Sequence, residues 1–284
     1  LEFRRVLFRS ERSTYLTQAV TTTTSPSSSP TILSLGSTQD IGKGVIEIDE
    51  ELIWVDSFDR VANTATIAPY GRGYLGTTPS TAAVDTKVTI SPIFPRNAIT
   101  KAVNDTIRAI GSQLMVVKQT TFTFNAAVNT YDLSDLNIEN ILTVMWQSTG
   151  PSKEWLPIKR WRFDPLANAP TFNTQKTVNI YESVQPGRTI KVWYTMVPDT
   201  MDNNTDDFVD VTGLPESCQD VVVYGAAYRL LTFLDAGRIN LTSAESDFAD
   251  SKNPYNSGSA ASRYVFALFQ QRLQEEALKL SDQF

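Results

Sequence analysis

The chain has 284 residues, of which 41% are hydrophobic, 10% aromatic and 20% charged, and its formal net charge is −6. This composition fits a globular protein with one large domain or two modest ones, and it lacks the excess of Lys and Arg needed to grip phosphate. Histidine is absent and Cys218 is the single cysteine, which excludes disulfides, thiolate metal cages and Ser-His or Cys-His nucleophile pairs.

Residues 1–10 resemble the in-frame translation of a sequencing adapter. We interpret them as an artefact in a metagenomic reading frame, assembled from environmental DNA, whose true N-terminus is missing. Residues 11–30 are expected to be a linker or arm, because Thr, Ser and two prolines dominate residues 20–30 and leave little to bury.

Residues 31–92 show strand patterns only and predict a small β module. Its strands are expected at residues 45–48, 52–55, 64–67 and 87–90. Between the last two strands, Gly71, Gly73 and Gly76 have the spacing of dinucleotide-binding turns. We reject a phosphate site there, because no helix opens after these glycines and no βαβ unit follows.

An acidic cluster occupies the first turn of this module. Paired carboxylates of this kind can serve glycoside hydrolysis when they flank a sugar. The interpretation that we favour is a solvated hairpin turn. The cluster consists of Glu47, Asp49, Glu50 and Glu51.

The rest of the chain, residues 93–284, begins with a predicted helix over residues 95–111, in which apolar residues recur every three or four positions. Strand patterns return over residues 114–197 and predict an antiparallel sandwich or barrel. The basic run at residues 159–162 interleaves an aromatic residue, as single-strand binding would require. We favour a strand with Trp161 and Phe163 inward and the arginines at 160 and 162 outward.

An acidic loop follows at residues 198–213. Asp202, Asn204 and Asp206 have the alternating spacing of calcium ligands and form a weak metal candidate. The match then fails, because Asp207 stands where the turn needs glycine and Gly213 where a bidentate glutamate is needed. We therefore favour a solvated loop.

Helices are predicted over residues 216–236 and 242–281, the second interrupted near Pro254 before a last helix at about residues 259–280. We expect that last helix to carry an apolar side formed by Tyr264, Leu268, Phe269, Leu273 and Leu280. The fold class is therefore α+β: a small N-terminal β module, a helix, an antiparallel β sandwich or barrel, and a C-terminal helical hairpin.

Two stretches carry a family resemblance. In the first, a strand pair at residues 45–55 precedes an Arg-Gly-x-x-Gly-Thr-Thr loop at residues 72–78 and the alanines 82 and 83. This stretch resembles a small β module found in phage neck and tail proteins. The second stretch has these features in order: Phe94-Pro95-Arg96, Trp155 and Trp161, the strand 189–194, Gly213-Leu214-Pro215, an Asp-x4-Gly-Ala-Ala-x-Arg-Leu-Leu helix at 220–231, Arg263-Tyr264, and Gln-Arg-Leu-Gln-Glu-Glu at 271–276.

That order is similar to the head-to-tail adaptor, or connector, proteins of siphophages. The resemblance implies a structural protein of the virion neck that needs no cofactor and is made in the host cytoplasm. The residues themselves predict that the chain is not an enzyme, since histidine is absent and cysteine single, and that it inserts in no membrane, since no stretch approaches the roughly 20 apolar residues of a membrane span. Its expected partners are the portal protein, neighbouring copies in a dodecameric ring and the next neck or tail protein, while DNA passes without specific binding. The candidate subunit or portal contacts are Gly225, Ala226, Ala227, Arg229, Arg263, Tyr264, Phe269 and Leu273.

Two alternatives stay open. The chain could be another tail or fibre component whose β module binds a host glycan or a neighbouring subunit. A more distant alternative is a carboxylate-based glycosidase.

Overall fold

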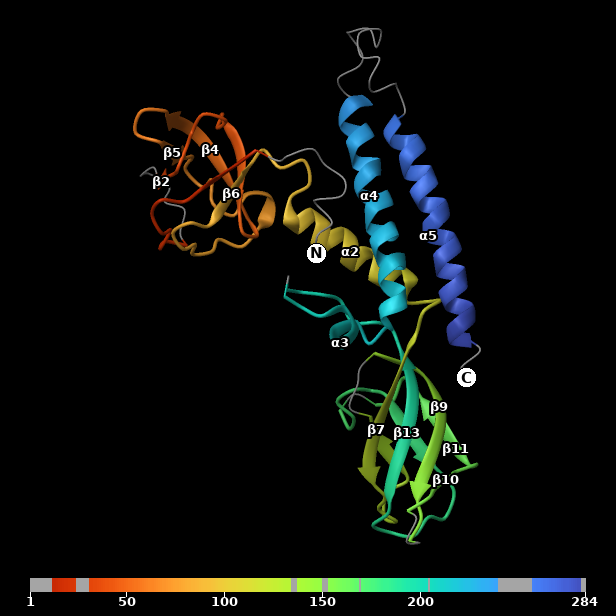
Figure 1. Cartoon of the computed structure of the whole chain (residues 1–284). Helices are drawn as coiled ribbons and strands as arrows, with labels where there is room; N and C mark the ends of the chain where they lie inside the picture. Colours follow the sequence, from red (N-terminus) through yellow and green to blue (C-terminus); the bar gives the residue numbers. More distant parts are fainter. Residues whose placement is uncertain are drawn as a thin grey trace. The chain divides into compact units, whose positions relative to one another are not determined.

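The computed structural model describes residues 12–23, 31–133, 137–149, 153–168, 170–203, 205–239 and 257–281. The chain divides into two compact units, Leu1–Ala102 and Val103–Phe284, so that the boundary lies within helix α2 (Arg96–Ile110). Figure 1 shows the elements of both units, which combine helices and antiparallel sheets. The predicted α+β class is thus confirmed. In the described part of the chain, no helix is long and apolar enough to cross a membrane.

The first unit contains a six-stranded antiparallel sheet in the spatial order β1-β6-β3-β4-β5-β2. The four strands predicted from the sequence are β3 to β6, and two further strands form its edges. The strands are β1 (Ser13–Tyr15), β2 (Thr31–Ser34), β3 (Gly44–Ile48), β4 (Glu51–Asp59), β5 (Thr64–Ile67) and β6 (Lys87–Ile90).

The two edges of this sheet meet, so that the sheet curls into a barrel. The N–H of Gly36 donates to the carbonyl oxygen of Tyr15, and the N–H of Thr17 donates to that of Ser34, both at 2.9 Å. These bonds pair groups that an open edge would leave exposed. Residues 12–23, which the sequence suggests as an arm, are therefore part of the barrel; residues 24–30 lie outside the described residues.

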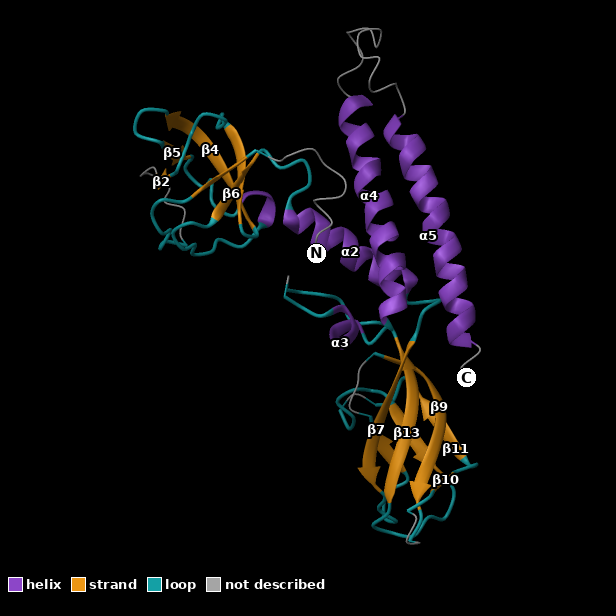
Figure 2. Cartoon of the chain, viewed as in Figure 1, coloured by secondary structure: helices purple, strands orange, loops and turns teal. Residues whose placement is uncertain are grey.

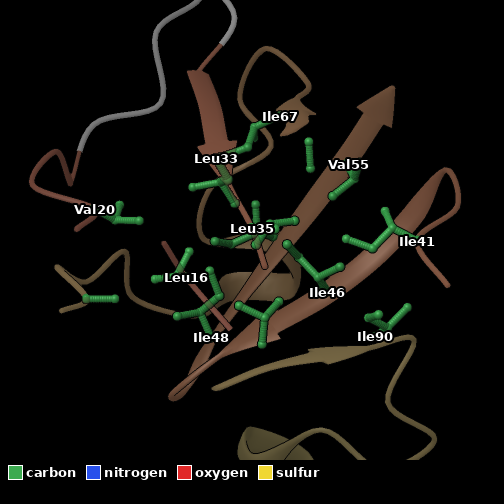
Figure 3. Packing of buried hydrophobic residues seen from close by; sticks show 14 residues of the cluster. Leu16, Val20, Leu33, Leu35, Ile41, Ile46, Ile48, Val55, Ile67 and Ile90 are labelled. Atoms are coloured by element: carbon green, nitrogen blue, oxygen red, sulfur yellow. The ribbon is translucent and has the colours of Figure 1, made fainter. Parts of the chain in front are cut away.

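The barrel core consists of apolar side chains from strands β2 to β6 and from the segments that flank the strands (Figure 3). Ile46 and Ile48 point inward from β3, Ile53 and Val55 from β4, as the period of two requires. Leu16, which follows β1, is fully buried among them. Burying one such side chain contributes about 1.5–3 kcal/mol, so Leu16 fixes the N-terminal segment in place.

The second unit contains a β sandwich, which confirms the architecture expected over residues 114–197 (Figure 2). One sheet has the order β10-β9-β13-β7 and the other β11-β12-β8. Phe122 and Tyr131, one from each sheet, stack with ring centroids 4.5 Å apart. The strands are β7 (Val116–Thr123), β8 (Thr130–Asp132), β9 (Ile138–Gln147), β10 (Trp155–Pro157), β11 (Trp161–Asp164), β12 (Thr177–Ile180) and β13 (Thr189–Met196).

The first and last strands of the sandwich are neighbours. β7 and β13 pair antiparallel over their whole length, with Val116 opposite Met196 and Thr123 opposite Thr189. The chain therefore enters and leaves the sandwich at the same end. The sandwich is in effect an insertion between α2 and the residues that follow β13.

Helices complete the second unit. They are α3 (Phe208–Thr212), the 3-10 turn η2 (Glu216–Cys218), α4 (Gln219–Ile239) and α5 (Ser257–Ser281). Helices α4 and α5 pack side by side as the expected hairpin (Figure 1). The part of the predicted second helix that precedes Pro254 lies outside the described residues.

The buried side of α5 differs from the expected one. Phe269 and Leu273 are buried as predicted, but Tyr264 is 68% exposed. The buried stripe instead includes Ser262 and Glu276. It follows the helical spacing of three and four residues, and its polar members have hydrogen-bond partners within the hairpin.

Candidate functional site

The Gly-Ala-Ala run of α4 lies where this helix meets α2 and α5. A Cβ atom on Gly225 would lie 2.2 Å from Cγ2 of Thr106 and 3.0 Å from Cε2 of Phe269. Ala226 and Ala227 are buried as well. Small side chains therefore allow α4 to approach its neighbours within one chain.

An aromatic cluster fills the space between the hairpin helices. The ring centroid of Tyr228 lies 5.0 Å from that of Phe266 and 5.6 Å from that of Phe269. The hydroxyl of Ser262 donates to the carbonyl oxygen of Tyr228 at 3.1 Å. The cluster joins α4 to α5 through dispersion contacts and a hydrogen bond between the two helices.

The base of the hairpin is closed by a group of ionic side chains. Arg272 pairs with Glu275 at 2.6 Å and with Glu276 at 3.2 Å, and Lys279 pairs with Glu276 at 2.6 Å. The hydroxyl of Ser217 donates to Glu276 at 2.8 Å. Burial alone would raise the pKa of Glu276, but hydrogen bonds from Lys279 and Ser217 and the positive charges of Lys279 and Arg272 lower it. The ionised carboxylate thus ties α5 to η2.

Cys218 lies beside this group and is buried. Burial, together with the charge of Glu276, raises the pKa of its thiol to about 11. Since the thiolate is the nucleophilic form, this cysteine is protonated at neutral pH and serves as a small apolar side chain.

The structure separates the contact candidates into two groups. It brings Gly225, Ala226, Ala227, Phe269 and Leu273 together inside the hairpin, where their own chain covers them. Arg263 and Tyr264 are exposed on α5. Arg229 is partly exposed, with its guanidinium carbon 5.3 Å from the ring centroid of Tyr228. Arg263 and Tyr264 are thus the candidates that a partner could reach.

The acidic loop is organised by its own backbone. One carboxylate oxygen of Asp206 accepts from the N–H groups of Asn203 and Asp202, at 2.8 and 3.0 Å. The bond from the backbone of Asn203 is the main reason why the pKa of Asp206 is lowered. Asp207 caps α3 by accepting from the N–H groups of Val209 and Asp210. Two of these carboxylates therefore bind backbone amides.

The calcium candidate gains no support. Asn204 lies outside the described residues, and among the described ones no group of three or more His, Cys, Asp or Glu side chains could hold a metal ion. The loop is instead fixed to α2: Asn104 donates to the carbonyl oxygen of Met201 at 2.8 Å and accepts from its N–H at 2.9 Å.

The acidic turn of the barrel is only partly solvated: Asp49 and Glu50 are exposed as expected, but the other two carboxylates are not. Glu47 and Glu51 are buried, with 2% and 1% of their surface exposed. Glu51 pairs with Arg72 through two bonds of 2.5 and 2.6 Å, and Glu47 accepts from the backbone N–H of Arg96 at the start of α2. Sequence reasoning missed this because the partners are 21 and 49 residues away. Both carboxylates are thus held in place by structural contacts.

Arg72 forms the centre of a clasp. Its guanidinium also donates to the carbonyl oxygens of Thr22 and Ser80, both at 2.7 Å. Glu51 accepts in turn from the N–H groups of Gly73 and Ser80, both at 3.0 Å. The Arg-Gly loop therefore binds the N-terminal segment to the barrel. Only the three-residue turn η1 (Tyr74–Gly76) follows Gly73, which has a φ of 63°, so the rejection of a dinucleotide turn stands.

The basic run behaves as the favoured interpretation predicts. Trp161 and Phe163 are partly buried on β11, whereas Arg160 and Arg162 are exposed. Sequence reasoning missed Asn104 and Arg72 as organising residues. Two features of the sequence could have indicated them: Asn104 is a polar residue three positions before the apolar Ile107 of the helix, and Arg72 lies between two glycines.

Comparison with known protein families matches residues 80–281 to the family described as SU10 adaptor protein. Comparison with curated proteins gives no match. The matched residues run from before β6 through α2 and the sandwich to the end of α5, more than half of the chain. This chain therefore belongs to the SU10 adaptor protein family, a family of phage structural adaptors.

Proposed function

We propose that this chain is a protein of the virion neck that forms a ring between portal and tail and continues the DNA channel. The observation that carries the proposal is the family match over residues 80–281, which includes α2, the sandwich and the hairpin. Identical subunits joined head to tail close into a ring when the rotation between neighbours allows it. A ring of this kind suits an adaptor placed on the axis of a portal, and we expect it to be dodecameric.

The charge distribution supports passage of DNA without specific binding. Residues 198–284 carry 14 Asp and Glu and six Lys and Arg, a net charge of −8. A negatively charged channel wall repels the phosphate backbone and prevents DNA from adhering.

Exposed residues of α5 are the proposed contact with the portal. Arg263 and Tyr264 are adjacent and exposed. Arginine and tyrosine dominate the binding energy of many protein interfaces. The buried candidates of α4 and α5 pack inside the hairpin and hold α5 in place.

We also infer that the chain is not an enzyme. A carboxylate-based glycosidase needs two carboxyl groups free to reach a sugar. Glu47 and Glu51 are buried and bind Arg96 and Arg72 instead, and the thiol of Cys218 is protonated.

The test is co-expression with the portal protein encoded by the same phage genome. We expect the chain to be monomeric alone and to form a ring on the portal, seen by electron microscopy. Arg263→Glu combined with Tyr264→Ala should weaken portal binding without changing the melting temperature. A stable trimer that ignores the portal would favour the fibre alternative, and hydrolysis of bacterial polysaccharide would overturn the non-enzymatic assignment.

A further inference from the structure

The outer face of the three-stranded sheet is basic. Arg162 lies in β11 and Arg160 directly precedes this strand, so the alternation of a strand puts both side chains on the same side of the chain. On β12, Asn179 is opposite Arg162, and the N–H of Tyr181 donates to the carbonyl oxygen of Arg160 at 2.9 Å. Tyr181 is 54% exposed. We call Lys159, Arg160, Arg162 and Tyr181 the basic sheet face.

No carboxylate forms an ion pair with the basic side chains of this face within the described residues. Lys159, Arg160 and Arg162 are exposed and form no ion pair there. The nearby carboxylate of Glu182 accepts from the backbone N–H groups of Lys159 and Arg160, at 2.8 and 3.4 Å. The sandwich as a whole is also positive, because residues 116–197 carry eight Lys and Arg and six Asp and Glu. An exposed arginine and tyrosine surface of this kind suits an acidic protein partner.

The same chain carries a complementary surface, which we call the acidic loop edge: Asp202, Asp207, Asp210 and Glu216, all exposed. Asp202, Asp210 and Glu216 form no ion pair within the described residues. The paired hydrogen bonds between Asn104 and Met201 and the Asp207 cap of α3 hold the backbone of this edge in place. A surface fixed before binding loses less conformational entropy on association.

We propose that the basic sheet face of one copy binds the acidic loop edge of the next copy, head to tail. The inference rests on the proposed ring, and it identifies the surfaces that build it. A ring requires two different patches that complement each other, whereas a two-fold dimer requires one patch that complements itself. Two basic sheet faces repel each other, as do two acidic loop edges. Opposite charges therefore favour the head-to-tail contact and oppose the two-fold one.

The test uses charge reversal on each surface. The basic-face variant is Arg160→Glu with Arg162→Glu, and the acidic-edge variant is Asp202→Lys with Asp210→Lys. Ring assembly on the portal is measured by native mass spectrometry and electron microscopy at physiological salt. Each variant alone should require at least about tenfold more subunit for half-assembly, because like charges then face one another across the contact.

The decisive experiment mixes the basic-face variant and the acidic-edge variant in equal amounts. Each contact between unlike variants again joins opposite charges, so rings should return with the two chains alternating. A chain that carries all four substitutions should also assemble on the portal without either of the other variants. The control is Lys43→Glu with Arg60→Glu, which reverses two exposed charges on the barrel and should leave assembly unchanged.

The outcomes separate the two proposals. If the wild-type chain forms no ring on the portal, the proposed function and this inference both fail. If the wild-type ring forms and the single-surface variants assemble as well as the control, the ring uses other surfaces and only this inference fails. Variants that lose assembly with an unchanged melting temperature, but are not restored by mixing, would also overturn it.

Discussion

The barrel and the hairpin are each closed by an arginine and a glutamate, but in opposite surroundings. The side chains of Arg72 and Glu51 are 0% and 1% exposed, so solvent does not screen this pair. Arg272 is 27% exposed and pairs with Glu275, which is 42% exposed, and with the buried Glu276, which Lys279 also binds. Removing one member of a buried pair leaves an uncompensated charge, whereas a partly exposed group can be rehydrated. Removing one partner should therefore cost the barrel more unfolding free energy than it costs the hairpin.

The strongest test of this contrast is Arg72→Ala. It leaves Glu51 buried without its cation and frees the carbonyl oxygen of Thr22, so the barrel should lose about 3–5 kcal/mol of unfolding free energy. Urea unfolding followed by the fluorescence of Trp54, which lies in β4, measures the loss in a background in which the other four tryptophans are replaced by phenylalanine. Arg72→Lys keeps the charge without the two parallel bonds and should lie between the wild type and Arg72→Ala. A loss below about 1 kcal/mol would show that the clasp does not behave as a buried pair.

Gly225→Ala tests whether the close packing of α4 contributes more to the stability of the hairpin than its ion pairs do. Alanine is favoured over glycine in a helix by about 1 kcal/mol, yet the added Cβ would meet Thr106 at 2.2 Å. We therefore expect a net loss of about 1–3 kcal/mol, seen in the helical circular dichroism signal on heating. Thr106→Ser removes the nearest methyl group and should recover part of that loss. A stabilised Gly225→Ala protein would contradict the close approach of α4 and α2.

Glu276→Gln should have a smaller effect and make the hairpin less sensitive to acid. Because the folded pKa of Glu276 lies below its ordinary value of 4.5, its ionised form contributes stability above that pH, and the contribution is lost as pH falls through the folded pKa. Glutamine keeps an acceptor for Ser217 but no charge, so we expect a loss of about 1 kcal/mol at neutral pH. Thermal melts of both proteins between neutral and acidic pH should converge on acidification, and parallel curves would contradict the prediction.

The smallest effect is expected for Lys43→Ala in the barrel. Lys43 and Asp56 form an ion pair of 2.7 Å, but their side chains are 65% and 50% exposed. Such pairs contribute about 0–1 kcal/mol, so the melting temperature should hardly move. If Lys43→Ala and Arg72→Ala lowered the free energy of unfolding by the same amount, burial of the ion pair would not explain the size of the loss.

The sequence predicts elements whose apolar residues repeat with a clear period. Strands β3 to β6 and helix α2 were found in this way, and their bounds agree within a few residues. Strand β1 (Ser13–Tyr15) was missed because three residues give no alternation, and its place depends on pairing with β6, more than 70 positions along the chain.

Polar contacts were harder to foresee than strands. The sequence gives no local sign that Glu51 and Arg72 meet, so acidic residues in a turn were interpreted as solvated. Tyr264 was placed on the wrong side of α5 because apolar character alone selected that side. The actual buried stripe includes Ser262 and Glu276, whose partners on α4 and η2 only the folded hairpin provides.

The paired hydrogen bonds between Asn104 and Met201 have a consequence for synthesis of the chain. They join residues 97 positions apart, on either side of the inserted sandwich. At about 5–20 residues per second on the ribosome, Asn104 waits on the order of 5–20 s before its partner has been translated. During that interval α2 has neither α4 nor Met201 to cover it, and it is exposed to wrong partners, including nascent copies on neighbouring ribosomes. The sandwich, complete once β13 emerges, brings the two segments together at one end, so its folding sets how soon Met201 can reach Asn104, whereas α4 is translated later still.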